Sequence, residues 1–197
     1  MNQALAEWNV TLAFAVVLIM GLPGSVVHAQ PQPTAAKTNS CQSPEYRSFD
    51  FWVGNWDAFD IDNSNKKVAH NRVDRILDGC VLLEDYQSKD GEHGQSFTIY
   101  DVSRKVWHQT WVTNEGALLV IEGGMHGGEM VLSGTDRTSE GKTRYVRGTW
   151  KPVSDGVREF AVTSTDGGKT WKPWFDLIFR PATPSTDGTK TSPDGKQ

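Results

Sequence analysis

The chain has 197 residues, with 24 acidic and 20 basic side chains and a formal net charge of −4. No strand-like segment carries a cluster of Lys or Arg, so nucleic-acid binding is not expected. Length alone allows one or two domains, but both ends differ in composition from the middle, which favours a single folded domain.

Residues 1–29 are predicted to be a signal peptide. An apolar run at 10–22 has the length of an h-region, and residues 27–29 form an A-x-A-like cleavage site. Glu7 departs from the pattern, because a positive charge is usual there. An uncleaved anchor is the alternative, but the run ends before Pro23, short of the roughly 20 apolar residues of a spanning helix. We therefore expect a periplasmic or secreted protein with no stable membrane anchor after cleavage.

Cys41 and Cys80 are the two cysteines of the chain. In an exported protein a single disulfide is the expected state, with two unpaired thiols as the alternative. The bridge would close a loop of about 40 residues and stabilise the fold by roughly 4 kcal/mol in the chain-entropy model.

Next come a flexible leader at residues 30–42 and, after Ser43, a short helix. Ser43 suits an N-cap and Pro44 suits the first helical position. Such a helix would cover one mouth of a barrel. Residues 181–197 are rich in Thr, Ser, Pro, Asp, Gly and Lys, which predicts a disordered tail.

Short apolar runs recur between turn signals over the middle of the chain. They lack a helical period, and connections this short join antiparallel neighbours. The clearest runs are residues 96–100, 105–113, 118–122, 129–133, 144–151 and 157–163. About ten strands without a long crossover predict an all-β fold over residues 43–180, an antiparallel up-and-down β-barrel of lipocalin-like type.

Gly54 and Trp56 form a Gly-x-Trp signature at the predicted first strand. In calycin-type barrels this Trp plugs the closed end, and an Arg from the last strand lies over its indole ring. Such a contact is worth about 0.5–2 kcal/mol. Arg180 has the matching position, so we expect it to stack on Trp56.

Residues 164–171 fit the Ser-x-Asp-x-Gly-x-Thr-Trp pattern of an Asp-box hairpin. Asp166 should accept backbone N–H groups, the two glycines should take positive φ, and Trp171 should pack beneath the turn. Because the box occurs once, a structural turn is favoured over sugar handling.

Several separated motifs occur in one order: residues 49–56, 77–80, 107–112 and 121–123, followed by the Asp-box-like hairpin. With this combination the chain resembles, over residues 46–180, a large family of exported bacterial proteins of unknown function with a lipocalin-like barrel. The resemblance implies a fold and no established activity. Asn55 and Val162 depart from that family, in which Glu is common at both places, so neither is expected to be catalytic.

Strand alternation predicts that Trp107, Gln109 and Trp111 share one face of their strand. Burying indoles is worth more than burying the imidazole of His108, so the Trp face should point inward. Gln109 then needs a polar partner or a ligand. His108 should lie outside, with a catalytic base or heme ligand as the alternative.

Four charged residues are candidates for the interior. Arg147 and Glu159 lie on strands joined by a short turn and could face each other inside, which would suit a polar or anionic ligand; an exposed cross-strand pair is the alternative. Glu84 and Asp176 each interrupt an apolar strand. A desolvated carboxylate there would have a raised pKa and could act as a general acid or base, whereas a solvated outer-face residue is the alternative.

No metal site or cofactor is expected, because no histidines after residue 30 are spaced to share a strand face. His126, in the Gly-rich turn at 123–128, leaves a heme-type pocket open as an alternative.

These patterns predict a barrel that binds a small, partly apolar molecule. An enzyme on the same barrel is the first alternative, an isomerase, lyase or hydrolase that uses a buried carboxylate as general acid or base. A structural envelope protein with a filled barrel is the second. The ligand-binding candidates are Trp111, Gln109, Arg147, Glu159, Glu84 and Asp176.

Overall fold

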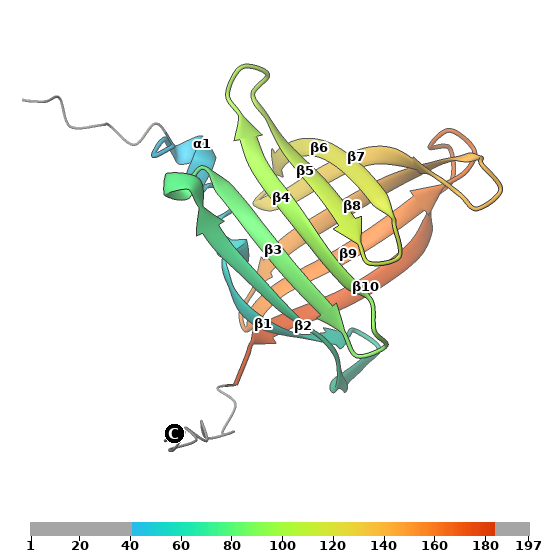
Figure 1. Ribbon diagram of the computed structural model, residues 1–197, viewed down its shortest axis with the longest axis horizontal. Helices are drawn as coiled ribbons and strands as arrows, with labels where there is room; N and C mark the ends of the chain where they lie inside the picture. Colours follow the sequence, from blue (N-terminus) through green and yellow to red (C-terminus); the bar gives the residue numbers. More distant parts are fainter. Residues whose placement is uncertain (1–40, 184–197) are drawn as a thin grey trace, which may run out of the picture. The chain divides into compact units, whose positions relative to one another are not determined.

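The computed structural model describes residues 41–183, which form a closed barrel of ten antiparallel strands. Each strand pairs with its neighbours in sequence, and β1 pairs with β10 to close the barrel (Figure 1). The predicted all-β up-and-down barrel is confirmed. The strands are β1 Gly54–Asp60, β2 Asn63–Ile76, β3 Val81–Ser88, β4 His93–Asp101, β5 Val106–Thr113, β6 Leu118–His126, β7 Glu129–Arg137, β8 Thr143–Val153, β9 Gly156–Ser164 and β10 Lys172–Pro181.

The predicted signal peptide and most of the predicted leader and tail lie outside the described residues. Pro181, assigned to the tail, is instead the last residue of β10.

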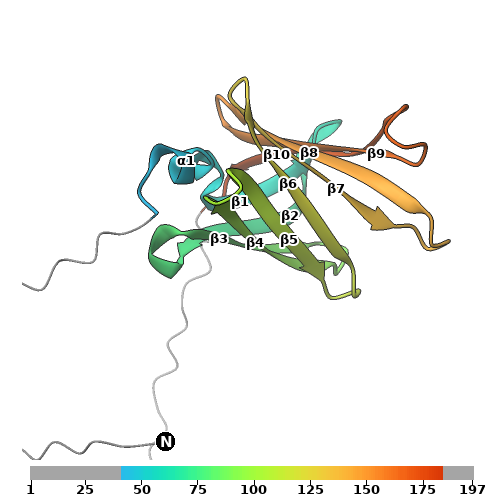
Figure 2. The ribbon, with the colours of Figure 1, turned by 90° about the horizontal axis from the view of Figure 1, so that it is seen from above.

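The predicted short helix is present as α1 (Pro44–Arg47), followed by a 3-10 turn, η1 (Asp50–Trp52). Pro44 begins the helix, although the Ser43 side chain makes no capping hydrogen bond. Figure 2 shows α1 beside one end of the barrel. The ring of Phe49, just after α1, lies 5.6 Å from the ring of Trp107. This segment therefore brings apolar side chains into that end, which we call the closed end.

Trp52 and Trp56 are central to the closed end, but Arg180 is not. The Trp56 ring stacks on Trp52 at 6.0 Å, and Trp56 Nε1 donates a 3.0 Å hydrogen bond to the Trp52 carbonyl. Trp56 is opposite Pro181 in the ladder, so Arg180 is opposite Asp57 and faces outward. There it lies over the Phe59 ring and binds Asp155. The expected stacking of Arg180 on Trp56 is therefore wrong, because adjacent residues of a strand face opposite sides.

Gly54 leaves room for the Trp56 indole. A Cβ atom on Gly54 would lie 2.6 Å from Trp56 Cζ2, closer than two carbon atoms can approach. Any other residue at position 54 would displace the ring, which gives the Gly-x-Trp spacing a steric reason.

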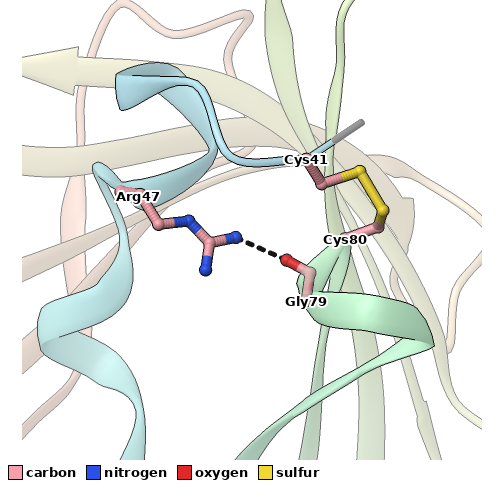
Figure 3. Close-up of a disulfide and its surroundings, with 4 residues drawn as sticks. All are labelled: Cys41, Arg47, Gly79 and Cys80. Atoms are coloured by element: carbon pink, nitrogen blue, oxygen red, sulfur yellow. Dashed lines mark hydrogen bonds between the residues drawn. A yellow bond between two sulfur atoms is a disulfide. The ribbon is translucent and has the colours of Figure 1, made fainter. Parts of the chain in front are cut away.

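The disulfide between Cys41 and Cys80 is present, with a Cα–Cα distance of 5.0 Å (Figure 3). Cys80 follows the turn η2 (Leu77–Gly79), whose three residues all have positive φ. In the same view, the Arg47 guanidinium donates to the Gly79 carbonyl. The helix segment is thus attached to the β2–β3 connection by a covalent bond and a hydrogen bond.

The β9–β10 loop has the predicted Asp-box geometry. Asp166 Oδ1 accepts backbone N–H bonds of 3.0 Å from both Lys169 and Thr170. Gly167 and Gly168 have φ of 79° and 82°. Trp171 Nε1 donates to the Gly168 carbonyl, so the indole is part of the turn.

Candidate functional site

A cavity of about 320 Å³ lies inside the barrel, within the range of about 300–1,000 Å³ that is usual for ligand pockets. Glu92, in the β3–β4 loop, and Trp174, at the start of β10, place it toward the end of the barrel opposite α1. Aromatic, acidic and amide side chains form the polar and aromatic part of its wall: Glu84, Tyr86, Glu92, Gln109, Trp111, Trp150, Glu159, Trp174 and Phe175 among others.

A buried polar network crosses one wall of the barrel from β2 to β5. Glu84 accepts a 2.9 Å hydrogen bond from Asn71 Nδ2 and a 2.8 Å hydrogen bond from Ser96 Oγ. Gln109 Nε2 in turn donates to Ser96 Oγ at 3.3 Å. Asn71, Ser96 and Gln109 are each at most 4% exposed. The network thus holds the Glu84 carboxyl in one position, with both oxygens hydrogen-bonded.

Glu159 faces the same cavity from β9, with β2, β1 and β10 between it and the strand of Glu84. Burial in the barrel raises the pKa of Glu159 well above its ordinary value, and the nearby charge of Glu84 raises it further. The nearby Trp150 indole opposes this rise, although Trp150 Nε1 is buried without a hydrogen-bond partner. Glu159 is therefore the carboxyl group of the pair that favours the protonated state.

Burial also raises the pKa of Glu84, but the hydrogen bonds from Ser96 and Asn71 oppose the change. Two carboxyl groups in one cavity thus have unequal environments. When two carboxyl groups have different pKa values, one can act as the acid and the other as the base at the same pH.

Tyr86 is on the same strand face as Glu84, two residues further along β3. Burial and the charges of Glu159, Glu92 and Glu84 raise the pKa of Tyr86 to about 12. The phenol therefore stays protonated at physiological pH and can donate a hydrogen bond into the cavity.

Indole rings form much of the apolar wall. The Trp111 ring contacts Tyr86 edge to face at 6.0 Å. Trp174 is 45% exposed, and on it lies the Arg144 guanidinium at 4.6 Å. The β9–β10 pairing is irregular between Pro173 and Phe175, which lets Trp174 border the cavity together with Phe175.

Four of the six predicted ligand-binding residues line this cavity: Trp111, Gln109, Glu84 and Glu159. The other two do not. Asp176 is on the outer side of β10, where it forms an ion pair with Arg158. Its carboxyl is therefore partnered outside the barrel.

Arg147 is on the outer surface and does not meet Glu159. Val146 and Gly148 line the cavity, so Arg147 between them points away, and its guanidinium lies over the Trp171 ring at 4.3 Å. In the β8–β9 ladder Arg147 is opposite Val162, whereas Glu159 is opposite Trp150. The predicted interior ion pair between Arg147 and Glu159 is therefore wrong. Arg147 and Trp150 are an odd number of residues apart on β8, so Arg147 faces the side opposite to Trp150 and Glu159.

Sequence reasoning missed Tyr86, Trp150 and Trp174 as lining residues. Strand alternation contained the signal for two of them, because Tyr86 shares a face with Glu84 and Trp150 pairs with Glu159. Trp174 had no such signal, because it lies at the pairing irregularity.

The two histidines singled out earlier do not line the cavity. His108 faces outward as predicted, with Nδ1 2.7 Å from Glu122 Oε1. His126 is exposed at the end of β6, beside the α1 segment. Among residues 41–183, no group of three or more His, Cys, Asp or Glu side chains could hold a metal ion.

No protein-family model matches the chain, and a comparison with curated proteins found no match. In the part that the structure describes, no helix is long and apolar enough to cross a membrane.

Proposed function

We propose that this protein binds a small, partly apolar molecule inside its barrel. The observation that carries the proposal is the 320 Å³ cavity, whose wall combines indole rings with a few fixed polar groups. Ligand sites commonly have this composition, in which apolar surface gives affinity and polar groups give orientation. A barrel filled with side chains, as a purely structural protein would have, is less consistent with this space.

The proposal is tested by titrating the purified protein with the neutral fluorescent dye N-phenyl-1-naphthylamine. We expect saturable binding that Ala161→Leu weakens by about tenfold or more, because Ala161 lines the cavity and the larger side chain would occupy it. Val162→Leu, on the next residue of β9 and the opposite face, is the matched control and should bind normally.

Absence of dye binding to the wild-type protein would contradict the proposal. So would equal binding by wild type and Ala161→Leu, because the dye would then sit elsewhere. Native mass spectrometry of protein from its producing cells adds an independent readout, since a retained molecule would reveal the chemical class of the ligand.

An enzyme on the same barrel is the second candidate, and the unequal environments of Glu84 and Glu159 favour it. Both pKa values are raised, that of Glu159 more than that of Glu84, and two carboxyl groups with unequal pKa values in one cavity are suited to general acid and general base roles. If a molecule identified by mass spectrometry is turned over, Glu159→Gln should lower kcat by about 10²–10⁴-fold. If that molecule binds without being turned over, the enzyme candidate is excluded for it and the binding function remains.

We also propose export to the periplasm or the medium and membership of the exported lipocalin-like family that the motifs resemble. The Cys41–Cys80 disulfide supports export, because such bonds persist in oxidising compartments. The ten-stranded barrel with Trp56 near its closed end supports the family resemblance. Fractionation of the producing cells, followed by N-terminal sequencing, would test the cleavage after Ala29.

A further inference from the structure

The charged side chains that line the cavity are all acidic. Three carboxyl groups, Glu84, Glu92 and Glu159, line it, together with the neutral polar groups of Tyr86 and Gln109. No Lys, Arg or His among the described residues lines it. An interior Arg147 would have suited an anionic ligand. Because Arg147 lies outside, no described residue supplies the cavity with a cationic side chain for an anion to bind.

The arginines on the strands around the cavity already have partners. Arg158, on the outer side, binds Asp176, and Arg147, also outside, lies over Trp171. Arg144 has the inward parity of Val146 and Gly148 on β8, but it is not among the lining residues, and it binds Asp136 and lies over Trp174. The negative groups of the cavity therefore have no cationic partner in the described part of the molecule. A buried carboxylate without a counter-ion is unfavourable, so a cation that enters the cavity would compensate it.

The apolar part of the wall also suits a cation. The rings of Trp111, Trp150 and Trp174 border the cavity, and indole is the aromatic group with the strongest attraction for cations. An ammonium group could thus donate charge-assisted hydrogen bonds to Glu159 and Glu84 while the apolar body of the same ligand packs on the indoles.

We propose that the ligand of the cavity is an organic cation, an amine that is protonated at physiological pH and carries an apolar or aromatic body. This inference rests on the proposed binding function and gives it a chemical class. An organic anion is disfavoured, since it would be desolvated beside the carboxyl groups of Glu84 and Glu159.

Binding of an amine should release a proton from the cavity. The titratable groups that line it are Glu84 and Tyr86 from β3, Glu92 from the β3–β4 loop and Glu159 from β9. The inward-facing ion pair of Arg144 and Asp136, on β8 and β7, is not part of this lining. A bound cation favours the ionised form of Glu159, which is the carboxyl whose protonated form is otherwise preferred. Amine affinity should consequently rise with pH, as long as the amine itself stays protonated.

The test compares three probes of similar shape by tryptophan fluorescence and calorimetry: 2-phenylethylamine, 2-phenylethanol and 3-phenylpropanoate. We expect the amine to bind about tenfold more tightly than the alcohol or better, and the carboxylate to bind most weakly. Calorimetry in two buffers of different ionisation enthalpy should detect proton release with the amine and none with the alcohol.

Three variants localise the effect. Glu159→Gln and Glu84→Gln should each remove most of the preference for the amine over the alcohol, and near-UV circular dichroism checks that each variant is folded. Glu140→Gln is the matched control, because its side chain is 70% exposed on the β7–β8 hairpin and pairs with Lys142. It removes the same charge and should leave all three affinities as they are.

Alcohol or carboxylate binding at least as tight as amine binding would overturn the inference, as would an amine preference that survives both cavity variants. Failure of all three probes to bind would overturn it too. The naphthylamine titration decides the proposed binding function separately, so a protein that takes up the neutral dye but does not prefer the amine retains that function and loses only the chemical class.

Discussion

Glu159 is the residue whose environment is least suited to its charge. It is opposite Trp150 in one ladder and Leu177 in the other, and the indole nitrogen beside it, Trp150 Nε1, is buried without a hydrogen-bond partner. Glu84, with the same side chain, has two hydrogen-bond donors. The two glutamates differ because β2 and β4 place Asn71 and Ser96 next to one of them only.

The raised pKa of Glu159 makes stability depend on pH. A group with a higher pKa in the folded state stabilises the fold fully below its unfolded pKa, about 4.3 for Glu. That stability is lost as the pH rises through the folded pKa. We expect the unfolding free energy of the wild type to fall from about pH 4.3 upward, and Glu159→Gln to be the more stable protein at pH 8.

Urea unfolding at a series of pH values measures this difference. Carboxyl groups with lowered pKa, such as Asp57 and Asp85, have the opposite effect and act at lower pH, in both proteins alike. Glu140→Gln should follow the wild type throughout. Parallel curves for wild type and Glu159→Gln would show that Glu159 titrates as an ordinary glutamate.

Among the elements, the α1 and η1 segment depends on connections to other parts of the chain. Four helical residues are too few to be stable alone, because a short helix makes few hydrogen bonds for the entropy that it loses. The disulfide and the Arg47–Gly79 hydrogen bond attach the segment to η2. The segment can then hold Phe49 and Trp52 in the closed end, where both are fully buried.

Replacing both Cys41 and Cys80 by Ser should therefore lower the unfolding free energy by about 2–4 kcal/mol, since the crosslink limits the freedom of the unfolded chain over a separation of 39 residues. Urea unfolding with and without reductant is the measurement. Reductant should lower the stability of the wild type to that of the double variant and leave the variant unchanged. Equal stabilities in the absence of reductant would contradict a stabilising role.

On the scale of the whole molecule, Trp52 packs against both the first and the last strand of the barrel, β1 and β10. It stacks on Trp56 of β1 and contacts Phe179 of β10 edge to face at 4.8 Å. Because β1 and β10 close the barrel, packing on both strands favours the closed form over an open sheet with exposed edges.

We expect Trp52→Ala to lower the unfolding free energy by about 3–5 kcal/mol, through the loss of a large buried ring and the cavity that remains. Trp174→Ala is the matched control, since the same atoms are removed from a ring that is 45% exposed, and it should cost less than about 1 kcal/mol. Chemical denaturation of the two variants compares them directly. Similar losses would mean that the closed end does not hold the barrel together.

The sequence by itself determined the barrel, the short helix, the disulfide and the Asp-box turn. These features depend on local patterns: alternating apolar residues, Gly and Asn at turns, Pro44 at a helix start, and two cysteines in a chain predicted to be exported. The inward positions of Gln109, Trp111 and Glu84 were also predicted. Side chains alternate along a strand, so one buried indole or apolar residue shows which alternate residues face inward.

Only the tertiary structure decided the sign of the charge in the cavity. Arg147 and Arg180 were assigned to the interior on sequence, and both lie outside, because one residue of register moves a side chain to the other face of a sheet. The approach of Glu84 to Glu159 depends on how β3 and β9 face each other across a closed barrel. That relation arises from strand pairing around the whole sheet, and no local segment contains it.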